Sequence, residues 1–326
     1  MEANYRDLVF TLGNAEAATL SEDSAYLASV AMRPSALSVN YWLNTRITGS
    51  PDFISQGRAM FCATAELAAG INYMDKLVVL ANGLDLFGIE TGTAALIGEE
   101  VVRIDAYDAL TQTLTIARGC ADTVPAKHAA STRIWFYESA VVYDTTEYST
   151  GTGLDVKLQP ITTQAEMPLD DVAQQQITFS GRQARPFPPG RFQINGEREP
   201  DEVIGTMTVS WAHRNRIIQA EHLIDTETAS ITPEEGTTYT IRLLRTDSGA
   251  VITEQTGITG TTVALLSTYT GEVRLELFSV RDGLQSWQKH EAVFNAQAGA
   301  ATESITWDST TWSFDQDTWT FDKTEI

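Results

Sequence analysis

Thr206-Met207-Thr208-Val209-Ser210-Trp211 is the stretch that decides the fold class of this chain. Small hydroxyl residues alternate with large apolar ones, so in an extended strand the three apolar side chains share one face. Val273-Arg274-Leu275-Glu276-Leu277-Phe278-Ser279 repeats the pattern, with arginine and glutamate on the second face. The two stretches therefore predict half-buried strands in two facing antiparallel sheets.

The sequence around these stretches predicts one compact sandwich over residues 190–290. Short apolar runs are separated by turn pairs such as Glu235-Gly236 and Ser248-Gly249. This spacing is typical of a small β-sandwich. The predicted strands are 191–195, 205–211, 238–244, 251–255, 261–266 and 272–280.

Residues 1–140 are predicted to form a β-rich domain of their own. Its short apolar runs are bounded by glycine and Asn-Gly turn signals. A helix is an alternative only around 21–33, and even there residues 26–30 suit a strand equally well. The predicted strands are 76–80, 100–104, 113–117 and 133–137. We therefore expect an all-β, multidomain chain of small antiparallel barrels or sandwiches.

The segment 141–189 is predicted to be an extended connector. It is rich in polar residues and ends in Arg185-Pro186-Phe187-Pro188-Pro189-Gly190. Each proline fixes its own φ and disfavours the helical region for the residue before it, so this stretch is stiff and extended. The arginines at 182, 185, 191 and 198 either bind acidic neighbours in a complex through bidentate pairs or are solvated with packed stems.

The last predicted unit, 291–326, is a tail that ends in one heptapeptide written three times. The copies are 306–312, 313–319 and 320–326, and each contains an aromatic residue followed by Asp. Exposed tryptophan favours a partner surface, so the tail is expected to dock as short strands. The partner is either the sandwich of the same chain or a neighbouring subunit. The predicted contact residues are Trp307, Trp312, Phe314, Trp319 and Phe321.

Composition excludes several classes of protein. The net charge is −21, from 22 basic and 43 acidic residues, and no segment is basic, so we expect no stable nucleic-acid binding. The acidic surface serves solubility, or it belongs to a face that must not retain passing DNA. The sequence contains no apolar stretch long enough for a membrane span and no recognisable signal peptide. The two cysteines are expected to be buried and reduced.

The candidate catalytic residues favour a structural interpretation. Cys120 and His128 flank Asp122, which permits a nucleophile–base pair, but no oxyanion motif accompanies them. Asp122 or Thr123 is expected to satisfy turn amides instead, with His128 as a polar cap. Glu99 and Glu100 face opposite sides of a strand, which argues against an acid–base dyad. We therefore predict a chain that is not an enzyme and has no metal or cofactor.

Residues 190–290 resemble a fibronectin type III domain. The family has a tryptophan in its second strand, matched by Trp211. The sixth strand of the family ends in a Gly-x-Ser turn, matched by Val273 to Ser286. The resemblance implies a seven-stranded sandwich and says almost nothing about function.

A narrower resemblance covers residues 97 to 290. The run from Ile97 to Phe136, with Gly-x-Glu, Arg-Gly, Asp-Thr, a histidine and a strand carrying tryptophan, is similar to tail-tip hub proteins of tailed bacteriophages. Trp211 to Arg216 and Arg281 to Trp287 supply two further hub-like pieces. The residues that carry the motif are Arg118, Gly119, Asp122, Thr123, His128, Trp135, Trp211 and Trp287.

The hub resemblance implies a structural virion protein of the tail tip or baseplate. Such hubs form a symmetric homo-oligomer, often a trimer, at the end of the tail tube, where they contact other phage tail proteins. The chain is then made in the host cytoplasm and supports host attachment and DNA delivery. The alternative is a host-binding adhesin or carbohydrate-binding module in which exposed tryptophans stack on sugar rings. A weaker third option is a tail-tip enzyme that digests the cell wall.

Overall fold

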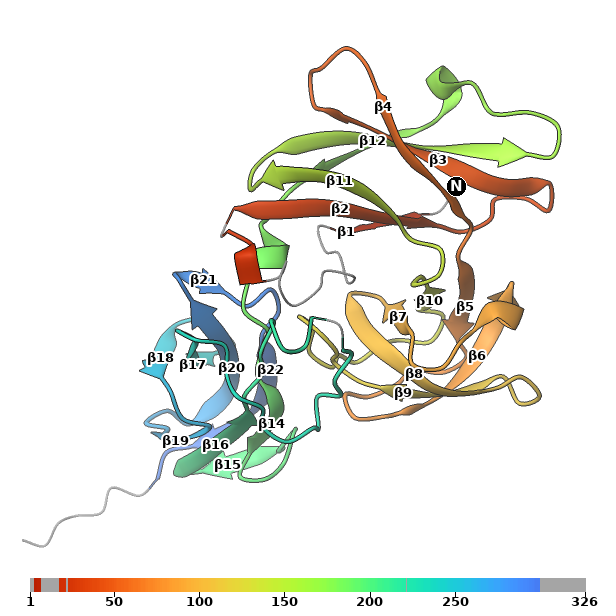
Figure 1. Ribbon diagram of the computed structural model, residues 1–326. Coiled ribbons are helices and arrows are strands. Elements are labelled where there is room, and N and C mark those ends of the chain that lie inside the picture. The colour runs from red at the N-terminus through yellow and green to blue at the C-terminus, as the bar shows by residue number, and fades with distance from the viewer. Residues whose placement is uncertain (1–2, 7–17, 22, 221, 300–326) are drawn as a thin grey trace, which may run out of the picture.

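The computed structural model describes residues 3–6, 18–21, 23–220 and 222–299. These residues form mostly β-strands, arranged in three units, which confirms the predicted all-β, multidomain class (Figure 1). We call the units the first sandwich, the barrel and the second sandwich. The tail residues Trp307, Trp312, Phe314, Trp319 and Phe321 lie outside the described residues.

The first sandwich is built from two segments that are far apart in the sequence. One sheet has the strand order β1-β2-β11 and the other β13-β12-β3-β4. Leu27, Tyr41, Val142 and Leu154 lie in the core between the two sheets. Its strands are β1 (Ala3–Arg6), β2 (Ser24–Ala31), β3 (Ser38–Ile47), β4 (Ile54–Met60), β11 (Val142–Ser149), β12 (Gly153–Thr162) and β13 (Gln174–Thr178).

This unit corrects two predictions. The segment 141–189 is not an extended connector over most of its length, because β11, β12 and β13 pair with strands of the first sandwich. The polar residues of these strands largely occupy solvent-facing positions, and their buried positions are spaced as in a half-buried strand. For the same reason residues 1–140 are not one domain. Residues 24–31 form a strand and not a helix, since β2 pairs on both sides.

The barrel is inserted between β4 and β11 of the first sandwich. It closes in the order β10-β5-β6-β9-β8-β7, so every strand has two neighbours. Its core includes Leu80, Ile97, Ile104, Ile116 and Ile134. The four strands predicted in this region are all present, as β6, β8, β9 and β10. The bounds are β5 (Ala63–Leu67), β6 (Leu77–Leu84), β7 (Ala94–Ile97), β8 (Glu100–Asp108), β9 (Thr113–Ala117) and β10 (Arg133–Phe136).

The second sandwich has the architecture predicted for it. Sheet β14-β16-β19 packs on sheet β15-β22-β20-β17-β18, a fibronectin type III-like arrangement. The predicted inward faces of β16 and β20 meet in one core. The strands are β14 (Gly190–Ile194), β15 (Glu202–Ile204), β16 (Thr206–Ala212), β17 (Thr238–Arg245), β18 (Val251–Ile258), β19 (Thr262–Leu266), β20 (Gly271–Arg281), β21 (Leu284–Gln285) and β22 (His290–Gln297).

The predicted boundary at residue 290 is wrong, because β22 belongs to the second sandwich and not to the tail. It pairs with β20 from His290 to Ala296, and its alternate residues Ala292, Phe294 and Ala296 are buried in the core. The sequence gives only a weak sign of this strand, because two of its three buried positions are alanines and alanine is a weak strand former.

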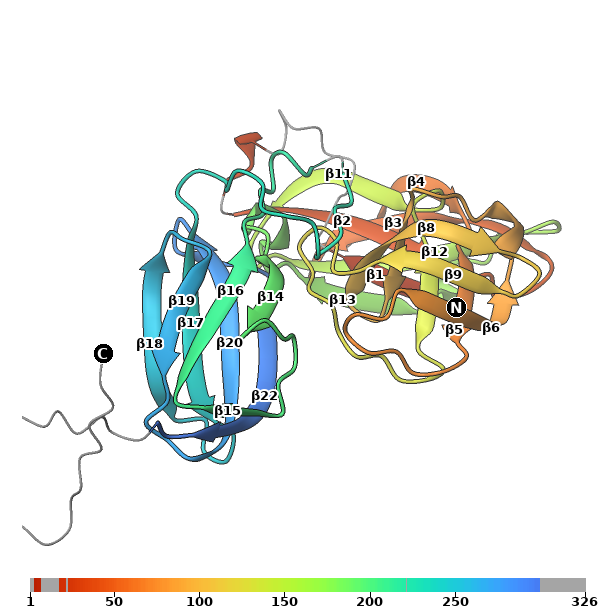
Figure 2. The same ribbon diagram turned by 90° about the horizontal axis from the view of Figure 1, so that it is seen from below.

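Two connections, one short and one long, bring the three units together (Figures 1 and 2). The 3-10 turn η3 (Arg182–Ala184) leads from the first sandwich to the second. The long connection 213–237 between β16 and β17 runs along the barrel, where it reaches Arg103 and Arg118. Two other 3-10 turns, η1 (Leu86–Gly88) and η2 (Leu169–Asp171), lie within loops of the barrel and the first sandwich. Within the described residues, no helix is both long and apolar enough to cross a bilayer.

Candidate functional site

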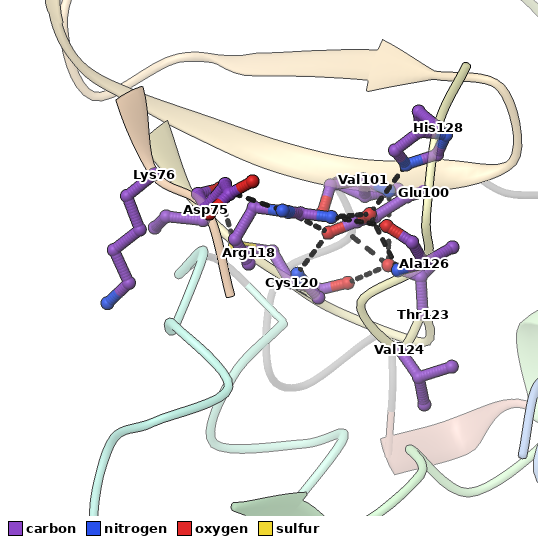
Figure 3. Close-up of polar contacts among 12 residues, drawn as sticks. Asp75, Lys76, Glu100, Val101, Arg118, Cys120, Thr123, Val124, Ala126 and His128 are labelled. Atoms are coloured by element: carbon purple, nitrogen blue, oxygen red, sulfur yellow. Dashed lines mark hydrogen bonds and ion pairs between the residues drawn. The ribbon is translucent and has the colours of Figure 1, made fainter. Parts of the chain in front are cut away.

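The Glu100 carboxylate is the centre of a buried polar network at one end of the barrel (Figure 3). Glu100 follows the tight Gly98-Glu99 turn between β7 and β8, and only 1% of it is exposed. Its oxygens accept hydrogen bonds from Arg118 Nε at 2.8 Å and Nη2 at 2.9 Å. The amides of Gly119 and Ala126 donate to it at 2.8 and 3.1 Å, and His128 Nε2 lies 2.8 Å away.

Arg118 is fully buried, and each of its five N–H groups has an acceptor. Three donate to Glu100 Oε1, Glu100 Oε2 and the Ala126 carbonyl. The two on Nη1 donate to the carbonyls of Asn72 and Asp75, at 2.7 and 2.8 Å. Arginine in a protein has five donors and is always charged, so this side chain is completely satisfied without water. The arginine thereby connects β8, β9 and the 72–75 loop.

The charges in this network compensate each other. Burial by itself raises the pKa of the Glu100 carboxyl, but hydrogen bonds and charge from Arg118 and His128 outweigh burial and hold that pKa below its usual range. The carboxylate therefore stays ionised and serves as a fixed acceptor. A group with this protonation behaviour is suited to holding structure and not to shuttling protons.

The turn from Gly119 to Thr123 positions these groups. Gly119 has φ +55°, and a Cβ there would lie 2.4 Å from Pro125 Cδ, so the turn requires glycine. Thr123 Oγ1 accepts from the Val101 amide at 3.0 Å and donates to the Cys120 carbonyl at 2.8 Å. The sequence predicts that Asp122 or Thr123 satisfies turn amides; in the structure Thr123 binds the Val101 amide of β8 and a carbonyl of the turn instead.

Cys120 is not placed as a nucleophile. It is fully buried in an apolar cluster, and burial raises the pKa of its thiol, so the reactive thiolate is disfavoured. His128, its predicted partner, is bound to Glu100 instead. Both cysteines are buried and free, as expected from the sequence.

Asp122 connects all three units through one arginine. Its carboxylate accepts a bidentate pair from Arg182, with Nη2 at 2.9 Å from Oδ1, and both side chains are almost completely buried. The Arg182 guanidinium also lies 5.0 Å from the ring centroid of Trp287, in the second sandwich. Arg182 forms a bidentate pair, but with Asp122 of the same chain and not with a neighbour in a complex, whereas Arg191 is exposed. We call Glu100, Arg118, Asp122, Arg182 and Trp287 the joint.

The long connection 213–237 adds a second set of contacts to the joint. The Thr226 amide donates to the Arg118 carbonyl at 2.9 Å, and Asp225 accepts from the Arg118 amide at 3.3 Å. Lys76 pairs with Asp225 at 3.0 Å and also with Glu227. Close to Trp287, Gln288 accepts from the Val124 amide and donates to the Glu99 carbonyl. The second sandwich is thus bound to the barrel through both main chain and side chains.

The remaining tryptophans of the predicted motif have packing roles. Trp135 is buried in the cluster that contains Val30 of the first sandwich and Leu96 of the barrel. Trp211 lies in the core of the second sandwich, with its ring centroid 5.4 Å from that of Tyr239. Of the eight motif residues, Arg118, Gly119, Thr123 and His128 surround Glu100, and Asp122 and Trp287 meet at Arg182.

The sequence places Glu100 in the Gly-x-Glu motif but does not identify it as the central acceptor, and it does not predict the contacts from Asp225 and Gln288. A signal for Glu100 existed, since it follows a Gly-x turn and precedes two valines, which places a charged residue at a buried strand start. Asp225 and Gln288 give no such signal, because their partners are more than a hundred residues away. Within the described residues, no three His, Cys, Asp or Glu side chains are arranged to hold a metal ion.

Comparison with known proteins identifies no family. No protein-family model and no curated protein matches the chain. The crystal structure of chicken CNTN1 FN1–FN3 domains is similar over 86% of this chain and 64% of that chain, with 8% identity and a TM-score of 0.23. A two-domain fibronectin type III segment of chicken tenascin is similar over 72% of this chain and 95% of that one, with 9% identity and a TM-score of 0.23. Superpositions this weak carry no argument, so the sandwich is assigned from its own strand order.

Proposed function

We propose that this chain is a structural, non-enzymatic component of a bacteriophage tail tip, of the hub or baseplate class. It assembles as a homo-oligomer, with a trimer favoured by the resemblance, and contacts other tail proteins. The proposal is based on one observation: segments that are far apart in the sequence meet in the structure. The hub-like pieces 97–138, 211–216 and 281–287 are separate in sequence, and residues from the first and third meet at the joint.

The middle hub-like piece, residues 211–216, also supports the contact between the barrel and the second sandwich. Arg214 donates to the carbonyls of Asp225, Thr226 and Thr228, which shapes the connection that reaches Arg118. Contacts from these segments hold the units in one fixed arrangement. A tail-tip ring depends on such fixed geometry, because each subunit must present its faces at constant angles to its neighbours.

The charge of the chain is compatible with this role. A net charge of −21 disfavours retention of nucleic acid, which suits a protein beside passing DNA. Under this proposal the protein does not bind nucleic acid stably. It is made in the host cytoplasm and becomes part of the virion.

Location in the particle tests the proposal. Antibodies raised against the purified chain should deposit gold at one end of the tail in particles of the virus that encodes it. Labelling along the capsid, or particles that lack the chain by mass spectrometry, would contradict the proposal.

Oligomeric state is a second test, and it addresses the tail. Light scattering on the full chain should give a homo-oligomer, whereas a chain ending at Gly299 should give a monomer. The shortened chain keeps β22, which ends at Gln297, so the second sandwich stays complete. A full chain that is monomeric at high concentration would favour the adhesin alternative over an assembly component.

A further inference from the structure

We infer that the cleft between the barrel and the second sandwich is a saccharide-binding site. This inference is independent of the proposed function, because it concerns residues outside the tail and needs no assembly. It is based on the shape of the cleft, on one aromatic side chain and on the polar groups at its floor.

The cleft has the size and position of a ligand site. Its volume is about 500 Å³, within the roughly 300–1,000 Å³ that small-molecule sites span, and such sites often lie between domains. One wall is the barrel turn at Val124, Pro125 and Ala126, and the floor is the outer face of the sheet that contains β17 and β20. The walls belong to units fixed by the joint, so the cleft is preformed.

Trp287 supplies an aromatic surface in this cleft. It lines the cleft and remains 37% exposed, although the guanidinium groups of Arg182 and Arg185 lie 5.0 and 6.0 Å from its ring centroid. These arginines restrict the indole before a ligand arrives, which lowers the entropy cost of binding. A pyranose ring has an apolar C–H face that packs on such an indole, while its hydroxyls remain available for hydrogen bonds.

Glu276 supplies a buried acceptor at the floor. Only 3% of this residue is exposed, and Arg274 Nε and Lys289 Nζ both bind its Oε1, at 3.1 and 2.7 Å. Glu276 also lines the cleft. An ionised carboxylate has about four acceptor sites, more than these two donors use, so it can also accept from a ligand hydroxyl.

Arginine and lysine donors lie around this acceptor. Arg242 is paired with Glu254 at 2.9 Å and lies over Phe278, at 5.2 Å from the ring centroid. Lys289 pairs with Glu291 as well as with Glu276. Sugar hydroxyls both donate and accept, so they match a cleft in which carboxylates and cations alternate.

Glycan binding by the full chain tests the inference. An array of neutral, uronic-acid and sialylated oligosaccharides should give at least one bound glycan, whose affinity is then measured by calorimetry. Trp287→Ala should weaken that affinity by about tenfold or more, as expected for a central aromatic contact. Trp42→Ala is the matched control, because Trp42 is also half-buried with an arginine, Arg58, 5.4 Å from its ring. The control should bind like the unmodified chain.

A second variant keeps the test decisive if Trp287→Ala loosens the joint. Arg242→Gln is outside the joint and should also weaken binding, by about threefold or more, with an unchanged melting temperature. The inference is overturned if the full chain binds no glycan at millimolar concentration, or if both variants retain full affinity. Binding that survives both variants but is lost in a chain ending at Gly299 would assign the sugar contact to the tail and also overturn it.

Discussion

At the scale of single residues, the joint contains a buried pair of opposite charges, Glu100 and Arg118. Glu100 and Arg118 are both inaccessible to solvent, and the arginine uses all of its donors. A buried pair adds little compared with an apolar packing of the same volume, but removing one partner leaves the other charged and unpaired in a medium of low polarity.

Glu100→Gln should therefore destabilise the fold strongly. Loss of the carboxylate leaves the Arg118 charge uncompensated, and we expect a decrease of about 3–5 kcal/mol in the free energy of unfolding. Urea unfolding followed by fluorescence measures this decrease. Asp247→Asn is the control, since it removes one carboxylate from the exposed Arg245–Asp247 pair and should leave the midpoint unchanged. Equal effects of the two substitutions would show that the buried network contributes no more than a surface pair.

His290 should make the second sandwich sensitive to acid. Burial, aided by the charges of Arg198 and Arg214, lowers the pKa of this imidazole from 6.5 to about 3, and its Nε2 donates to the Pro189 carbonyl. The unfolded chain binds a proton below about pH 6.5 and the folded chain does not, so stability is complete above that pH. It should fall by up to about 1.4 kcal/mol for each pH unit below it.

His290→Gln tests this expectation, because glutamine keeps an N–H donor and does not titrate. Thermal melts from about pH 7 to about pH 4 should show a smaller loss of stability in this variant than in the unmodified chain. His222→Gln, at an exposed histidine, should leave the slope unchanged. A slope that His290→Gln does not reduce would assign the acid sensitivity to other groups, among them Glu100, whose lowered pKa acts only at lower pH.

At the scale of elements, the local sequence pattern predicts strands in which apolar and polar residues alternate, and it misses strands without this alternation. The strands β16 and β20 were predictable because apolar and polar residues alternate in them over six or more positions. The strands β11, β12 and β13 were mistaken for a connector, since their threonines, tyrosines and glutamines give no strong period. In the structure β11 pairs with β2, β12 with β3 and β13 with β12, and such tertiary pairing overrides weak local preference.

Gly119→Ala should disrupt the turn that positions Arg118. The left-handed backbone costs a residue with a Cβ about 1–2 kcal/mol, and the overlap with Pro125 adds to that cost. Gly151→Ala is a matched control, because Gly151 also has a positive φ, of +85°, but no atom lies within 4 Å of the added Cβ. Thermal denaturation should show a clearly larger loss for Gly119→Ala. Equal losses would mean that Pro125 moves aside at no cost.

Arg214 should hold the long connection 213–237 in place. Its guanidinium donates to five backbone carbonyls of this connection, and Gly190 lies so close that a Cβ there would be 2.4 Å from Arg214 Cζ. Arg214→Met should increase hydrogen exchange at the amides of Thr226 and Thr228, because the carbonyls of the loop lose the donor that holds them together. Arg191→Met, at an exposed arginine, should not. Unchanged protection at these amides in Arg214→Met would contradict the assignment.

At the scale of the whole molecule, the insertion of the barrel into the first sandwich could not be predicted from the sequence. The strands β3 and β12 pair over their whole length, although about a hundred residues separate them, and no local pattern reports such a partner. The joint was predictable in part. Its motif residues were named from the sequence, but the partner of each, Glu100 for Arg118 and Arg182 for Asp122, is defined only by the fold.

The spin–spin distance between the barrel and the second sandwich tests most directly the claim that the joint fixes these units as one rigid body. Cysteines introduced at the exposed positions Leu110 and Ser248 can carry the labels, while Cys62 and Cys120 stay buried. Double electron–electron resonance on the full chain should give one narrow distance distribution, because the connections to Arg118 and Asp122 hold the second sandwich in one position relative to the barrel. A broad or bimodal distribution in the unmodified chain would contradict the rigid joint.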